Sequence, residues 1–95
     1  MIMVKKLEEI VEDFMEEQFE NWIDLACDDY DELESYGLGE GDEKEYARMR
    51  MQEVGDDVED FYDFVDGEER FIGYDKQDVI DSIKTYLTKN GYDIK

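Results

Sequence analysis

The residues of this chain that could do chemistry are its carboxylates, and seven of them recur at intervals of four residues. The 95 residues include 30 acids and 10 bases, and no base lies between Lys6 and Lys44. On a helix, residues four apart are neighbours, so like charges at this spacing repel by about 0.2–0.5 kcal/mol per pair. The row, hereafter the acidic ladder, consists of Glu8, Glu12, Glu16, Glu20, Asp24, Asp28 and Glu32. Because this repulsion opposes folding, the acidic ladder favours a role in binding a positively charged partner.

A second group of carboxylates lies in a stretch without bases that runs from Met51 to Glu69. Hereafter the acidic cluster, it consists of Asp56, Asp57, Asp60 and Asp63. Residues 74–95 hold four Asp and four Lys, so the whole formal net charge of −20 arises from residues 1–73. Such a surface is repelled by nucleic acid and by anionic membranes and is attracted to basic proteins.

Catalytic chemistry is weakly supported by the residue types present. The chain has no His, which is the usual general base near neutral pH, and its only serines are Ser35 and Ser82. A pair of carboxylates can cleave glycosides, but two neighbouring acids carry no information in a chain with 30 of them. We therefore expect no enzyme, no catalytic residue and no cofactor.

Two acidic segments, residues 56–60 and 63–68, resemble calcium loops at first sight. They lack the alternating oxygen ligands, the glycine at the sixth position and the closing Glu of such a loop, so we expect no metal site. The single Cys27 lies on an apolar row and is predicted to be a small core residue. One cysteine forms no internal disulfide, and no secretory signal or membrane span is evident, so we expect a cytoplasmic protein.

The spacing of apolar residues predicts a mainly α fold in a single domain over residues 1–95, with a long helix over residues 4–36. Two apolar rows share the four-residue period of the acidic ladder: Leu7, Val11, Met15, Phe19, Ile23 and Cys27, and Ile10, Phe14, Gln18, Trp22, Ala26 and Tyr30. Each step of four drifts by about 40° around a helix axis. Either different elements therefore cover the two ends of this helix, or it bends or breaks between Gln18 and Asp29.

Glycines and caps divide the rest of the chain. Gly37 is predicted to cap the long helix, and three further helices are expected over residues 43–54, 57–66 and 76–89. Their expected N-caps are Asp42, Asp56 and Asp75, and their expected stops are Gly55, Gly67 and Asn90-Gly91. Residues 70–74 and 92–94 are short and apolar, and they could pair as a small two-stranded β patch.

The aromatic residues extend the expected binding surface. Phe61, Tyr62 and Phe64 point in different directions from one short predicted helix, so one or two of them should be exposed. An exposed aromatic ring beside carboxylates is a good anchor for a protein partner.

The linear charge density of residues 7–43 is close to that of nucleic acid. As one helix they would span about 55 Å, with one carboxylate per ~3.5 Å, against ~3.4 Å per phosphate along one DNA strand. In size, acidity and helical content the chain resembles the small acidic DNA-mimic inhibitors of phages and mobile elements, of the antirestriction and anti-CRISPR type. The resemblance implies a non-enzymatic inhibitor that occupies the basic groove of a nucleic-acid-binding protein, such as a host CRISPR effector or restriction enzyme, in the host cytoplasm.

Two alternatives remain open at this stage. The acids could serve solubility, as in halophilic proteins, although the neutral last quarter fits that poorly. The chain could also be a helical interaction module, antitoxin-like or a chaperone of a basic protein, that binds through an apolar groove. A homodimer is compatible with the sequence and would have to form through apolar surfaces, since two acidic surfaces repel each other.

Overall fold

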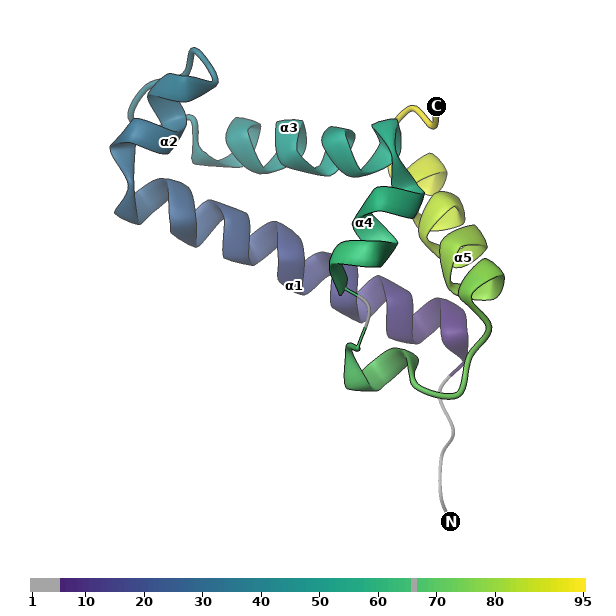
Figure 1. The fold of residues 1–95 in the computed structure, drawn as a ribbon. Coiled ribbons are helices and arrows are strands. Elements are labelled where there is room, and N and C mark those ends of the chain that lie inside the picture. Colours follow the sequence, from purple (N-terminus) through teal and green to yellow (C-terminus); the bar gives the residue numbers. More distant parts are fainter. Residues whose placement is uncertain (1–5, 66) are drawn as a thin grey trace.

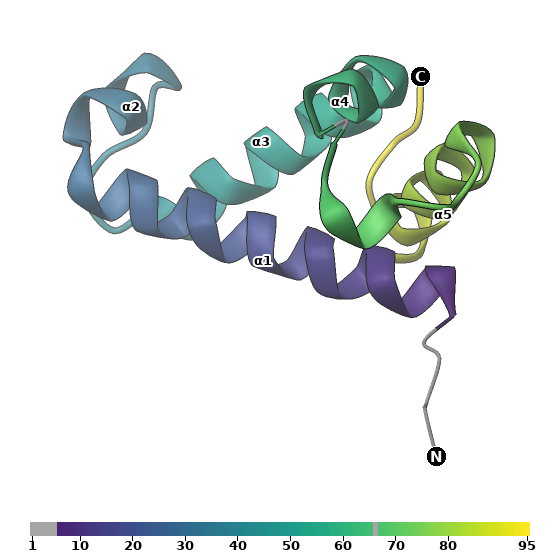
Figure 2. The ribbon, with the colours of Figure 1, turned by 60° about the horizontal axis from the view of Figure 1, so that its bottom comes forward.

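The computed structural model describes residues 6–65 and 67–95, and over these residues the chain is almost entirely helical (Figure 1). The elements follow in the order α1 (Leu7–Asp28), α2 (Tyr30–Ser35), α3 (Glu43–Asp56), α4 (Val58–Val65), the 3₁₀ helix η1 (Glu69–Phe71) and α5 (Lys76–Lys89). The mainly α fold and the long N-terminal helix are confirmed. Figure 2 shows the other helices on one side of α1, so that no other described helix lies on its opposite side.

The predicted long helix breaks at Asp29. The backbone of Asp29 is extended, with φ −129° and ψ 95°, and its side chain accepts a 3.0 Å hydrogen bond from the N–H of Asp31. This side chain starts α2 as an N-cap, which is the reason that the chain turns here. The break lies at the end of the predicted interval, and the predicted start at Val4 lies outside the described residues.

Different elements cover the two ends of α1, as the four-residue period of its apolar rows requires. Val11, Phe14 and Met15 near its start pack in one core cluster with the buried side of α5, namely Val79, Ile80, Ile83 and Leu87. Near its end, Ala26 packs in a second cluster with Leu33 of α2 and Tyr46 of α3. The drift of the apolar rows is therefore absorbed by a change of partner along α1.

Two predicted glycine caps are confirmed. Gly37 and Gly91 have positive φ, of 73° and 86°, which glycine adopts without steric penalty. The N–H of Leu38 bonds to the carbonyl of Leu33 at 2.9 Å, and an equivalent bond ends α5. α2 and α5 thus end with the hydrogen bonding of a Schellman motif.

Gly55 does not end the second predicted helix, because α3 continues through it to Asp56. A Cβ atom at Gly55 would lie 2.4 Å from the carbonyl oxygen of Asp93, so the glycine admits the C-terminal segment. The N-cap of α4 is consequently Asp57 and not Asp56: Asp57 Oδ1 accepts a 3.0 Å hydrogen bond from the N–H of Asp60.

The β patch is not supported, since the described residues contain no strand. Phe71 turns inward from η1 and packs edge-on against Phe14, with ring centroids 5.1 Å apart. Residues 92–95 lie against α3 instead. The side-chain amide of Gln52 exchanges hydrogen bonds of 2.9 and 3.1 Å with the backbone of Asp93, and the N–H of Lys95 bonds to the Gly55 carbonyl at 3.0 Å.

Candidate partner-binding surface

Six of the seven ladder carboxylates lie on α1, and all six are exposed: Glu8, Glu12, Glu16, Glu20, Asp24 and Asp28. Because α1 is continuous, five steps of about 40° wind this row through about 200° while it rises about 30 Å along the axis. The row therefore does not keep to one side of α1 but passes more than halfway around it.

Among the residues that the structure describes, no ion pair involves a ladder carboxylate of α1. Within residues 6–65 and 67–95, the ion pairs involve other acids, such as Glu17 with Arg70 and Glu45 with Arg48. In all, α1 carries nine carboxylates in 22 residues, which is one per about 3.7 Å of its ~33 Å length. The continuous helix is shorter than the ~55 Å that residues 7–43 would span as one helix, but its charge density stays close to that of a DNA strand.

Glu32, the last ladder residue, differs from the others. It lies on α2, is half-buried, and accepts a 3.0 Å hydrogen bond from the hydroxyl of the buried Tyr46. Burial and this hydrogen bond raise the pKa of Tyr46 to about 12. Glu32 therefore stabilises the second core cluster in addition to carrying charge.

α1 ends at Asp28, and its last turn contains no base. The carboxyl end of a helix carries a partial negative charge, so Asp24 and Asp28 add to an existing negative potential. Cys27 is exposed here, which corrects its predicted burial, and its thiol lies 3.9 Å from Oε1 of Glu43. Partial desolvation and the carboxylates of Glu43, Asp24 and Asp28 raise the pKa of the Cys27 thiol, so it is a poor nucleophile.

The acidic cluster is largely engaged within the chain. Asp56 lies 3.4 Å from the ammonium of Lys95, Asp57 caps α4, and Asp63 lies 3.8 Å from the ammonium of Lys76. Only the side chain of Asp60 has no such partner among the described residues. These ion pairs are exposed, so they contribute little to stability and can be exchanged for a partner's cations.

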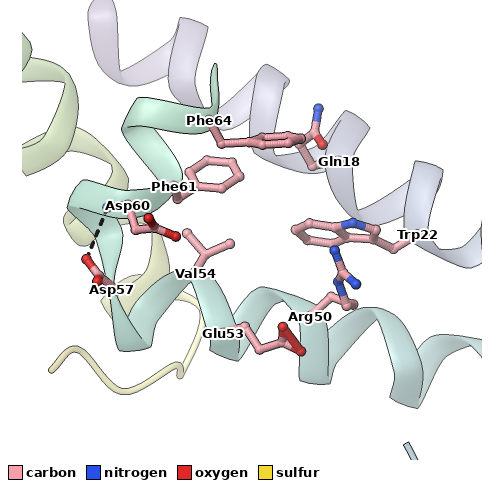
Figure 3. Close-up of a pocket in the computed structure, with 9 residues that line it drawn as sticks. All are labelled: Gln18, Trp22, Arg50, Glu53, Val54, Asp57, Asp60, Phe61 and Phe64. Atoms are coloured by element: carbon pink, nitrogen blue, oxygen red, sulfur yellow. Dashed lines mark hydrogen bonds between the residues drawn. The ribbon is translucent and has the colours of Figure 1, made fainter. Parts of the chain in front are cut away.

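A cleft of about 330 Å³ lies where α1, α3 and α4 meet (Figure 3). Figure 3 shows Asp60, Phe61 and Phe64 reaching toward it from α4, opposite the side chain of Trp22. Phe64 is 83% exposed, so the expectation of an exposed aromatic ring beside carboxylates is confirmed. The remaining lining residues are Gln18, Arg50, Glu53, Val54 and Asp57.

One side of the cleft holds a guanidinium stacked on an aromatic ring. The Cζ atom of Arg50 lies 5.5 Å from the ring centroid of Trp22 and 6.0 Å from that of Tyr46. Arg50 also donates a 3.5 Å hydrogen bond to the Tyr36 hydroxyl, which donates to Glu53. Sequence reasoning did not identify Arg50 or Glu53 as site residues. The available signal was that Arg48 and Arg50 are the only arginines before residue 70.

The acidic ladder and the cleft face different ways. Trp22 is two residues from both Glu20 and Asp24, and two residues turn about 200° around a helix. The middle of the ladder therefore points away from the cleft that Trp22 lines. The fold does not join the predicted site residues into one patch but presents two surfaces.

The described part of the chain shows no group of three or more His, Cys, Asp or Glu side chains placed to hold a metal ion. None of its helices is long and apolar enough to cross a membrane. Comparison of the chain with protein-family models, with curated proteins and with solved structures finds no match in any of the three.

Proposed function

We propose that this protein is a non-enzymatic inhibitor that mimics nucleic acid and blocks the basic groove of a host defence nuclease, either a CRISPR effector or a restriction enzyme. The observation that carries the proposal is the exposed row from Glu8 to Asp28 on one continuous helix, which makes no ion pair among the described residues. Packing explains the apolar rows of α1, but it does not require every exposed position beside them to avoid lysine and arginine.

The mechanism would be competition. The carboxylates of α1 would take the places of phosphates against lysines and arginines of the groove, at a spacing close to that of a DNA strand. The negative end of the α1 dipole, beside Asp24 and Asp28, would add to the attraction. Such binding is steered by charge, so it should be fast at low salt and weaken steeply as salt rises.

Charge reversal on the ladder tests the proposal. A panel of CRISPR effector nucleases and restriction endonucleases would be incubated with the protein at low salt before DNA is added, and cleavage would be measured. We expect stoichiometric inhibition of at least one enzyme, relieved by excess DNA and by salt. The variant with Glu12, Glu16, Glu20 and Asp24 replaced by Lys should lose it while circular dichroism shows an intact fold. Equal inhibition by this variant would contradict mimicry by the ladder, and no inhibition of any enzyme would contradict the proposed function.

A second candidate function is a helical module that binds a protein through apolar contacts, antitoxin-like or as a chaperone of a basic protein. The exposed side chains of Phe64 and of Ile72, which is 71% exposed, favour it. Binding of this kind buries apolar surface, so it should be nearly indifferent to salt and to competing DNA. The salt dependence of the inhibition assay therefore separates the two functions.

A further inference from the structure

We propose that the cleft between α1, α3 and α4 receives an arginine side chain of the basic partner. This inference rests on the proposed function, because it takes a basic protein as the partner, and it adds a specific contact to a general attraction. The lining combines two kinds of group that a guanidinium binds: the rings of Trp22, Phe61 and Phe64, and the carboxylates of Glu53 and Asp60.

The chain itself shows how a guanidinium fits these surroundings. Arg50 already lies over Trp22 at 5.5 Å and contacts the tyrosine hydroxyl that donates to Glu53. Arg50 thus occupies the α3 side of the cleft. On the α4 side, Figure 3 shows the Asp60 carboxylate and the Phe61 and Phe64 rings turned toward the open space. A second guanidinium there would find the same chemistry without a resident cation.

The charge and size of the cleft favour a single long cationic side chain. Three carboxylates and one guanidinium line it, so a net charge of −2 faces the space. Its volume of about 330 Å³ is at the lower end of the ~300–1,000 Å³ of ligand pockets. An apolar side chain would desolvate Asp60 without supplying a countercharge, which is unfavourable. An arginine supplies that charge and can stack its planar group on a phenyl ring, which lysine does less well.

The exposure of Phe64 points to the same partner. A phenyl ring that is 83% exposed at the mouth of a cleft gains little for the free protein. Covered by the stem and guanidinium of an arginine, the ring would become a desolvated anchor of the kind that dominates binding energy in interfaces.

Two peptides of equal charge provide the test. Each has ten residues with six bases, all arginine in one and all lysine in the other, separated by glycine and serine. Trp22 is the only tryptophan of the chain, so its fluorescence reports occupation of the cleft. We expect the arginine peptide to change this fluorescence and to bind about fivefold more tightly than the lysine peptide.

Matched variants assign that preference to the cleft. Asp60→Asn and Phe64→Ala should abolish it. Glu59→Gln, which removes a neighbouring exposed charge from α4, and Ile72→Ala, which removes an exposed apolar side chain elsewhere, should keep it. All four residues are exposed, so the variants should fold.

The outcomes separate the inference from the proposed function. No arginine preference in the natural protein, or a preference that survives in both cleft variants, would overturn the cleft inference. If both peptides still bound in that case, and neutral substitutions on the ladder weakened both equally, mimicry by the ladder would stand. If neither peptide bound the natural protein at low salt, the proposed function and the cleft inference would both be wrong.

Discussion

Removing charge from the middle of the acidic ladder should make the protein more stable. In α1, Glu16 and Glu20 are exposed and each has a carboxylate four residues away on both sides. No base lies beside them within the described residues to offset that repulsion. A double variant, Glu16→Gln with Glu20→Gln, removes the two charges and keeps side chains of nearly equal helix propensity. Any change in stability should therefore reflect charge.

The magnitude follows from the pairs that are lost. The double variant eliminates three like-charge pairs at four-residue spacing: Glu12 with Glu16, Glu16 with Glu20, and Glu20 with Asp24. At about 0.2–0.5 kcal/mol each, these amount to about 0.6–1.5 kcal/mol. For a domain of this size, 1 kcal/mol shifts the Tm by about 4–8 °C, so we expect an increase of roughly 3–12 °C at low salt.

Thermal unfolding followed by circular dichroism measures this increase. The control is Glu40→Gln with Asp93→Asn, which removes two exposed charges from non-helical positions and should change the Tm much less. In 1 M salt the screening length falls to about 3 Å, and the gain of the ladder variant should largely disappear. An equal gain in the control, or a gain that persists in 1 M salt, would refute the idea that ladder repulsion strains the fold.

Three further predictions concern stability, each measured by urea denaturation. The pKa of Tyr46, raised to about 12 from 10.0, means that the folded state keeps a proton which the unfolded chain loses. The stabilisation that protonated Tyr46 gives the folded state should therefore be complete below pH 10 and should fall between pH 10 and 12. Tyr46→Phe should reduce this loss of stability. Gly55→Ala should destabilise by about 1–3 kcal/mol through collision with Asp93, but should stabilise once the last three residues are deleted. Asp57→Ala should cost about 0.5–2 kcal/mol, more than Asp75→Ala, because the side chain of Asp57 makes a cap hydrogen bond and that of Asp75 does not; equal costs would contradict this.

The sequence predicts helix bounds and caps correctly where neighbouring residues determine them. The bounds of α5 and the caps at Gly37 and Gly91 follow from apolar period and glycine chemistry, and all three predictions are confirmed. Gly55 was misread because a glycine signals either a helix end or a close backbone approach. Only the fold shows that Asp93 approaches here. The prediction of a β patch is wrong for the same reason, since the backbone of Asp93 bonds to the side chain of Gln52 on α3 rather than to a strand.

The ladder could be predicted and the cleft could not, for one physical reason. Exposure of a charged row follows from the helical period, because the apolar rows of the same helix determine which face is buried. The cleft needs side chains from three helices, and the position of Arg50 over Trp22 depends on how α1 and α3 pack. Of these residues, sequence reasoning reached the aromatic rings and Asp60, but not Arg50 or Glu53.

The change of packing partner along α1 bears directly on what the ladder is for. The apolar rows drift with the same period as the acids, and α5 covers one end of that drift while the second core cluster covers the other. The regular spacing of the ladder is therefore in part a consequence of packing. Packing, however, is indifferent to the sign of an exposed charge, and a lysine at Glu12, Glu16 or Glu20 would relieve repulsion at no expense to the core. The absence of any base on α1 is thus the feature that folding alone does not explain and that the proposed cationic partner would explain.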